Sequence, residues 1–221
     1  MIVDIRTYTV QPGALGAYLK LYGSEGWPIQ NQHLKDACAG YYAVDIGVQN
    51  RVVHLWRYPD IAERAKRRAG MESDAGWNAY RSKSASFMVT QENKIMRPTP
   101  FWPAMKAEGA GPFQTIDYRT YTLAPGKAGA FFKLYESEGM ATQSKHLGNC
   151  IGFYQSDIGT QHQVVHLWAY TDLNDRTRRR AAMMADPAWN AYLAKASPLF
   201  THMENSILRP APFWTERGAK T

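Results

Sequence analysis

Apolar and polar residues alternate over the first ten residues of the chain. Asp4, Arg6 and Tyr8 fall on one face, and Val3 and Ile5 fall on the other. A period of two is typical of a β-strand, because successive side chains point to opposite sides of a sheet. The N-terminal segment is therefore predicted to be a strand with one polar and one apolar face.

A helix is predicted next, because apolar residues recur every three or four positions after a Pro-Gly turn. The stripe consists of Leu15, Tyr18, Leu19 and Tyr22. Glu25 extends the same stripe, and Gly26 is predicted to end the helix. A carboxylate on an apolar stripe is partly desolvated, which favours proton transfer; the alternative is a solvated side chain at a frayed helix end.

The rest of the unit continues with strands over 40–46 and 51–58, joined by a hairpin turn. Asp60 and Glu63 have the spacing of a capping box and predict a helix from Ile61. Asp74 predicts the start of another helix, and residues 92–97 predict a last strand that ends at a proline. The order β-α-β-β-α-(α)-β is that of a ferredoxin-like unit.

The whole unit occurs twice. DIRTYT, at residues 4–9, returns as DYRTYT at 117–122, VVHLW at 52–56 returns at 164–168, and WNAY at 77–80 returns at 189–192. One residue is lost from the second copy near the position of Lys35. The predicted domains are residues 1–104 and 113–221, with a Gly- and Ala-rich linker over Met105–Pro112.

Two such units predict an α+β fold. The tandem ferredoxin-like units are expected to pair with each other as a pseudo-dimer of the dimeric α+β-barrel type. Helices are expected on one face of each sheet, which leaves the other face bare unless a second sheet covers it. Asp4, Arg6 and Tyr8 are then expected to point into a hollow between the sheets, together with their second-copy counterparts.

The strings RTYT-x₂-PG, YxSEG, DIG-x-Q, VVHLWRY, DPAWNAY and ENxIxRPxPF resemble the NIPSNAP family over nearly the whole chain. The resemblance implies a fold of the dimeric α+β-barrel group, which includes cofactor-independent monooxygenases, isomerases and haem proteins. Animal members are associated with mitochondria and with trafficking and mitophagy partners. No transit segment is recognised here, so that role is not transferred.

The formal net charge of +7 is concentrated in two short basic runs, at 64–68 and 176–180. No aromatic residues interleave with these arginines, so solvated helix faces are favoured over nucleic-acid binding. Two cysteines and no secretion-like start favour a reducing, cytoplasmic location. No apolar run is long enough for a membrane span. The sequence leaves open whether the chain, as a pseudo-dimer, assembles further into a homo-oligomer.

The strongest candidates for chemistry are His54 and His166, which lie in the middle of a strand and could act as general bases or ligand contacts. The alternative is a hydrogen-bonded core histidine. Glu25 and Glu138 are the other catalytic candidates. The substrate-binding candidates are Arg6, Tyr8, Trp56, Arg97, Arg119, Tyr121, Trp168 and Arg209. Arginine can hold a carboxylate through two parallel hydrogen bonds, although a structural ion pair is equally consistent with the pattern.

No metal-binding spacing or nucleotide-binding loop is present, and no cofactor is expected. His33 and His146 leave haem as a minor alternative. The leading hypothesis is an enzyme that acts on a small anionic or aromatic metabolite by cofactor-independent proton transfer, as in an isomerase or lyase, or by oxygenation. The second hypothesis is a non-catalytic scaffold that binds a ligand, a protein or a membrane surface.

Overall fold

The computed structural model describes residues 1–35, 37–102 and 113–214. The predicted linker over Met105–Pro112 lies outside these residues. The chain divides into two compact units, one formed by residues 1–96 with the chain from residue 209 on, and the other by residues 97–208. These are called unit 1 and unit 2, and each is described by itself.

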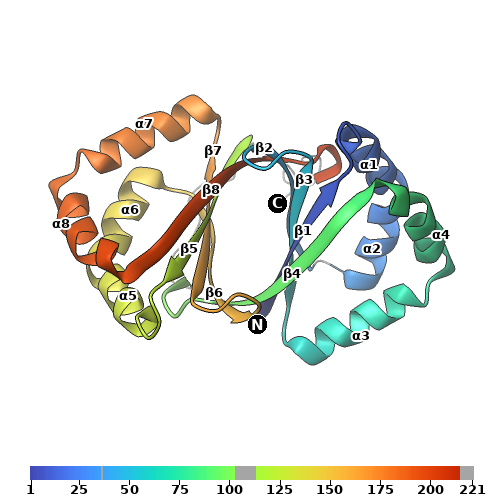
Figure 1. The fold of residues 1–221 in the computed structure, drawn as a ribbon, viewed down its shortest axis with the longest axis horizontal. Coiled ribbons are helices and arrows are strands. Elements are labelled where there is room, and N and C mark those ends of the chain that lie inside the picture. The colour runs from blue at the N-terminus through green and yellow to red at the C-terminus, as the bar shows by residue number, and fades with distance from the viewer. Residues whose placement is uncertain (36, 103–112, 215–221) are drawn as a thin grey trace. The chain divides into compact units, whose positions relative to one another are not determined.

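Unit 1 has the predicted order of elements (Figure 1). They are β1 (Ile2–Val10), α1 (Leu15–Leu21), the π-helical turn η1 (Tyr22–Gly26), α2 (Trp27–Leu34), β2 (Cys38–Ile46), β3 (Arg51–Tyr58), α3 (Ile61–Glu72), α4 (Ala75–Ser84), the 3₁₀ turn η2 (Ala85–Phe87) and β4 (Met88–Pro98). Strand β1 pairs with β3 and β4, and β2 pairs with β3, all antiparallel. The helices cover one face of this sheet (Figure 1).

Unit 2 repeats this arrangement (Figure 1). Its elements are β5 (Thr115–Leu123), α5 (Ala128–Leu134), η4 (Tyr135–Gly139), α6 (Met140–Leu147), β6 (Cys150–Ile158), β7 (Gln163–Tyr170), α7 (Leu173–Met184), α8 (Pro187–Ala196), η5 (Ser197–Leu199) and β8 (Phe200–Pro210). Strand β5 pairs with β7 and β8, and β6 pairs with β7, again antiparallel. The predicted α+β class with tandem ferredoxin-like units is confirmed.

The last segment of each repeat packs in the unit that holds most of the other repeat. Ala211 donates its backbone N–H to the Tyr41 carbonyl oxygen at 2.9 Å, and the ring of Phe213 lies 5.1 Å from that of Tyr22. In unit 2, Thr99 bonds the Phe153 carbonyl oxygen at 3.1 Å in the same way. The compact units therefore divide the chain at different places from the sequence repeats.

Two of the predicted helix starts are confirmed by their caps. The side chain of Asp60 accepts the backbone N–H of Glu63 at 2.8 Å, and Asp74 accepts that of Trp77 at 2.9 Å. Each bond satisfies a donor that the first turn of a helix leaves free.

The predicted helix end at Gly26 is wrong. The helical path continues through a π turn, Tyr22–Gly26, directly into α2. A π turn contains one more residue than an α turn, so it rotates the face that later residues present. For this reason Glu25 does not continue the apolar stripe of α1.

Replacing Gly26 by alanine is expected to lower the free energy of unfolding by about 1–3 kcal/mol. A Cβ at this position would lie 2.8 Å from ring atoms of both Tyr22 and Tyr80, and both rings are buried. Chemical denaturation measures the change. Gly16→Ala in α1 is the matched control, because no atom beyond its chain neighbours and the nearby helix backbone lies within 4 Å of its added Cβ. The control should be neutral or stabilising, and an equally benign Gly26→Ala would contradict the close packing.

Candidate functional site

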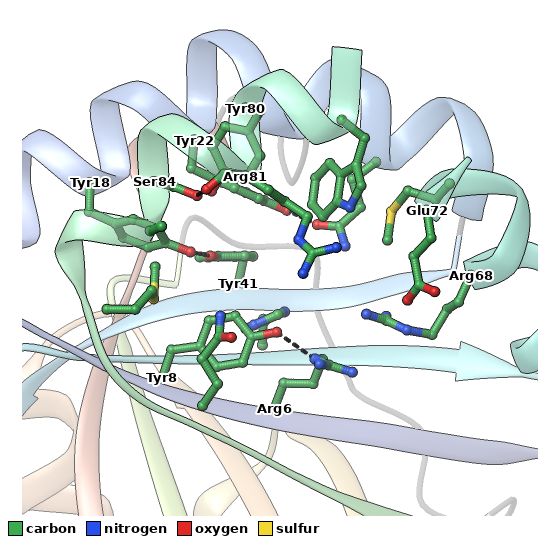
Figure 2. Close-up of a pocket in the computed structure, with 17 residues that line it drawn as sticks. Arg6, Tyr8, Tyr18, Tyr22, Tyr41, Arg68, Glu72, Tyr80, Arg81 and Ser84 are labelled. Atoms are coloured by element: carbon green, nitrogen blue, oxygen red, sulfur yellow. Dashed lines mark hydrogen bonds between the residues drawn. The ribbon is translucent and has the colours of Figure 1, made fainter. Parts of the chain in front are cut away.

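A cavity of about 310 Å³ lies between the sheet and the helices of unit 1 (Figure 2). Its floor is formed by side chains of β1, β2, β3 and β4, and its roof by side chains of the helices. The volume is at the lower end of the range for small-molecule sites, which suits a ligand with a single ring. We call this cavity the unit 1 pocket.

The floor includes Arg6, Tyr8 and His54, three of the residues predicted from the sequence. They do not face the side of the sheet that was expected. Asp4, on the same face of β1, is fully buried and accepts a hydrogen bond from Arg64 of α3 at 2.8 Å. This corrects the predicted orientation: the polar face of β1 lies under the helices of its own unit.

Asp4 also anchors Arg6, whose Nη1 lies 3.2 Å from the Asp4 carboxylate. The Nε–H of Arg6 is donated to the hydroxyl oxygen of Tyr8 at 2.7 Å, as Figure 2 shows. The Tyr8 oxygen accepts this bond, so its own O–H is available as a donor. Arg6 and Tyr8 therefore reach the pocket as one fixed pair.

His54 is buried and held by rings on three sides. Tyr41 stacks on the imidazole at a centroid distance of 4.6 Å, Tyr8 meets it edge-on at 4.8 Å, and Trp56 donates its indole Nε1–H to His54 Nδ1 at 2.6 Å. An indole can only donate, so Nδ1 must be the acceptor. Burial, with Arg6 and Arg68 nearby, lowers the pKa of His54 well below 6.5.

A neutral imidazole that accepts at Nδ1 carries its proton on Nε2. This Nε2–H is buried and has no hydrogen-bond partner among the residues the structure describes. We therefore assign His54 as a hydrogen-bond donor, in place of the general base suggested by the sequence. A buried donor without a partner costs about 1–3 kcal/mol, which marks a position for a ligand atom or a water.

The deep end of the pocket is lined with tyrosine hydroxyls. The hydroxyls of Tyr18 and Tyr41 lie 2.8 Å apart, and the Tyr22 hydroxyl donates to the amide oxygen of Gln30. Burial raises the pKa values of Tyr18, Tyr22 and Tyr41 well above 10, and that of Tyr80 to about 12. These hydroxyls stay protonated at neutral pH and serve as neutral donors and acceptors.

The outer part of the pocket is charged. Arg68 and Glu72 reach it from the C-terminal half of α3, and Arg81 reaches it from α4 (Figure 2). The Nη1 of Arg68 is buried and has no hydrogen-bond partner among the described residues. Two arginines beside one carboxylate leave a net positive opening, which favours an anionic ligand.

Several candidates lie outside the unit 1 pocket. Trp56 is fully buried and acts by fixing the imidazole of His54. Glu25 forms an exposed ion pair with Lys83 at 2.8 Å, and Arg209 pairs with Asp45 at 3.0 Å.

Unit 2 places its candidates in the same manner. Arg97 pairs with Asp157 at 3.0 Å, and Glu138 pairs with Lys195 at 2.8 Å. Trp168 donates to Nδ1 of His166 at 2.8 Å, and the Arg119 Nε–H is donated to the Tyr121 hydroxyl at 2.6 Å.

The minor haem alternative rested on His33 and His146. Their Nε2 atoms lie 2.9 Å and 2.8 Å from the carboxylates of Asp74 and Asp186, which cap the following helices. Both imidazoles thus belong to helix-end networks. In the described ranges, no cluster of three or more His, Cys, Asp or Glu side chains has the geometry to hold a metal ion.

The NIPSNAP family model matches residues 3–103 and 116–214. The chain belongs to the NIPSNAP family. It is 26% identical to human NipSnap homolog 2 over 95% of this chain and 72% of that protein. It is 24% identical to the Dictyostelium discoideum homolog over 95% of this chain and 87% of that protein. It spans only 40% of the length of a Caenorhabditis elegans NipSnap relative.

Solved structures of this NIPSNAP protein's relatives include Atu4242 from Agrobacterium tumefaciens. The two chains are 42% identical over the matched region, which covers 45% of this chain and 96% of Atu4242, with a TM-score of 0.44. A monooxygenase-like protein from Fusobacterium nucleatum matches 95% of this chain and 92% of its own, with 9% identity and a TM-score of 0.63. This likeness confirms the fold class of the dimeric α+β-barrel type. Among the described residues of this NIPSNAP protein, no helix has the length and apolar character to cross a membrane.

Proposed function

We propose that unit 1 binds a small anionic, ring-bearing metabolite in its pocket and catalyses cofactor-independent chemistry on it. The observation that carries the proposal concerns His54, which lines a cavity with an arginine-rich opening and whose buried Nε2–H has no partner among the described residues. An oxygen atom of the ligand would satisfy this donor. Arg68 and Arg81 supply charge for a carboxylate of the same ligand.

The donor set suits a reaction that forms an oxyanion. Removal of a proton from a carbon beside a carbonyl group, or from a phenol hydroxyl, leaves the electron pair on oxygen, and the resulting anion accepts from His54 Nε2–H. Preorganised neutral donors in a site that excludes water stabilise such charge effectively. Among the described residues that line the pocket, Glu72 is the carboxylate available to receive the proton.

Three outcomes can follow this step, and they cover the predicted proton-transfer and oxygenation chemistry. Return of the proton from Glu72 to a different atom of the substrate gives an isomerisation, and departure of a leaving group gives a lyase reaction. Alternatively, the electron-rich anion reacts with dioxygen as co-substrate, which gives oxygenation. All of these share the same first step, so one set of variants tests them together.

Binding is tested by a thermal-shift screen of small carboxylates, phenols and keto acids against the whole chain. Hits should raise the melting temperature of the wild-type protein. His54→Phe should raise their dissociation constant at least about tenfold, which corresponds to a loss of about 1.4 kcal/mol of binding free energy. Glu25→Gln is the matched control, since Glu25 lies outside the pocket, and its affinity should be unchanged. Equal affinity in His54→Phe and the wild type would refute the assigned site.

Catalysis is tested with the best ligand by following exchange of its carbon-bound proton in deuterated water and by oxygen uptake. Glu72→Gln is expected to slow turnover by about a hundredfold or more, because general-base removal typically costs 10²–10⁴ in rate. Glu25→Gln should turn over at the wild-type rate. A ligand that binds tightly but shows no exchange and no oxygen uptake would refute the enzyme and leave the non-catalytic binding protein.

A further inference from the structure

The two units of this chain preserve the same frame around the same histidine. In unit 2, the His166 imidazole accepts the Trp168 indole N–H, and burial lowers its pKa well below 6.5. Tyr135 donates to the Gln143 amide oxygen at 2.7 Å, as Tyr22 does to Gln30 in unit 1. The backbone and the deep aromatic layer are thus shared, so differences between the units can be compared position by position.

The polar lining of the pocket is not shared. Aligning the repeats shows that six polar residues lining the unit 1 pocket are apolar in the second copy. The changes, from unit 1 to unit 2, are Tyr18 to Phe131, Tyr41 to Phe153, Glu72 to Met184, Arg81 to Leu193, Ser84 to Ala196 and Gln91 to Met203. Each of them removes a charge or a hydrogen-bonding group.

The added hydrocarbon in unit 2 packs against aromatic rings at positions equivalent to the lining of the unit 1 pocket. Phe200 stands at the position of Met88, and its ring lies 5.3 Å from Tyr121 and 5.2 Å from Phe131. Phe153 stacks on His166 at 4.8 Å with an interplanar angle of 14°. Phe131 and Phe153, which replace Tyr18 and Tyr41, cannot supply the paired hydroxyls of unit 1.

The charged opening has also been lost. Met184 and Met203, which replace Glu72 and Gln91, are 47% and 49% exposed. Apolar side chains at an exposed position neither attract an anion nor remove a proton. Unit 2 therefore lacks both the carboxylate proposed as the base and one of the two arginines at the opening.

We infer that the chain carries one working site, in unit 1, and that the six polar residues absent from unit 2 determine its ligand recognition. Unit 2 retains the aromatic frame without the polar lining. This inference rests on the proposed function for the ligand class, but the assignment to one unit stands on the comparison of the two linings.

The inference is tested by titrating the whole chain, labelled with ¹⁵N in its histidine rings, with 4-hydroxybenzoate. This probe carries a carboxylate for the arginines and a hydroxyl for the deep end. The imidazole signals of His54 should shift, those of His166 should not, and calorimetry should give one site per chain. Two sites per chain, or a shift of His166 equal to that of His54, would overturn the assignment.

A variant of unit 1 that carries the six residues of unit 2 provides the second arm. It should lose the His54 response while its circular dichroism spectrum is unchanged. If the probe binds neither unit of the wild type, the proposed ligand class fails, and the inference is then decided by stability alone. A triple variant of unit 1 then tests the inference: Tyr18→Phe, Tyr41→Phe, Ser84→Ala. It should melt at or above the wild-type temperature, because the three hydroxyls serve a ligand rather than the fold.

A melting temperature several degrees lower in that triple variant would overturn the inference, since the polar groups would then be structural. The reverse change in unit 2, Phe131→Tyr with Phe153→Tyr and Ala196→Ser, is the matched comparison. It should lower the melting temperature, because it forces hydroxyls into tightly packed hydrocarbon.

Discussion

Replacing Asp4 by alanine is expected to lower the free energy of unfolding by about 3–5 kcal/mol, the usual cost of leaving a buried charge without its partner. Asp4 is fully buried, and its carboxylate accepts hydrogen bonds from Arg6 at 3.2 Å and Arg64 at 2.8 Å. Without the carboxylate, the largely buried Arg6 guanidinium keeps its desolvation penalty and loses its counter-charge. The Asn93 amide, 3.4 Å from the carboxylate, loses its acceptor as well.

Urea denaturation of the whole chain measures this loss. Asp45→Ala is the matched control, since it also removes an arginine–carboxylate pair, 3.0 Å long, but Arg209 in that pair is mostly exposed. Exposed pairs contribute about 0–1 kcal/mol. If Asp4→Ala and Asp45→Ala cost the same, the polar face of β1 is not buried beneath the helices as described.

The second large effect is a loss of stability in mild acid. The pKa values of His54 and His166 lie well below 6.5, mainly because both rings are buried. Above pH 6.5 the imidazoles are neutral in the folded and unfolded chain alike. As the pH falls below 6.5, the unfolded chain binds protons that the folded chain does not, so unfolding becomes easier.

Each histidine contributes about 1.4 kcal/mol per pH unit in this range. Between pH 7 and pH 5 the two together are expected to remove up to about 4 kcal/mol of stability. Urea titrations at half-unit intervals measure the slope. The lowered carboxyl pKa values of Asp74 and Asp186 act only at lower pH, because their unshifted value is 3.8.

The double variant His54→Phe, His166→Phe separates these histidines from other titrating groups. Its stability at pH 7 will differ from wild type, since Trp56 and Trp168 lose their acceptors, but its slope between pH 6.5 and 5 should be nearly flat. A slope equal to that of the wild type would show that other groups titrate, and that the two imidazoles are not the buried neutral rings described.

The order of elements and the duplication could be predicted from the sequence because they depend on local period and direct repetition. The face of β1 that meets the helices could not. Both faces of the strand are buried, with Val3 and Ile5 on one and Asp4 on the other. A polar face is expected to lie away from the helices, but here the arginines of β1 and α3 supply partners for the buried carboxylate.

The sequence predicts only some of the pocket residues, because the direction of a side chain depends on packing that the hydrophobic pattern does not show. Arg6, Tyr8 and His54 stand out because they are polar residues within strands. Tyr18 appeared only as a member of an apolar stripe, since the period does not reveal where a hydroxyl points. Arg68 belongs to a basic run that reads as a solvated surface, and its turn toward the sheet depends on packing.

The sequence predicts Glu25 and not Glu72 as a candidate, because the position of Glu25 extends an apolar α-helical stripe. The π turn at residues 22–26 changes that phase, and Glu25 instead pairs with Lys83 at the surface. A single extra residue in one helical turn cannot be seen in the hydrophobic pattern. Comparison of the two repeats could have pointed to Glu72, since the second copy keeps Glu25 as Glu138 but replaces Glu72 by Met184.

The protonation state of His54 tests the site most directly. Long-range ¹H–¹⁵N spectra of the whole chain with labelled histidine rings distinguish the two neutral tautomers from the imidazolium. At pH 7, His54 should be neutral with its proton on Nε2, the buried nitrogen that lacks a partner among the described residues. A proton on Nδ1, or a charged ring, would contradict the donor role from which the proposed function follows.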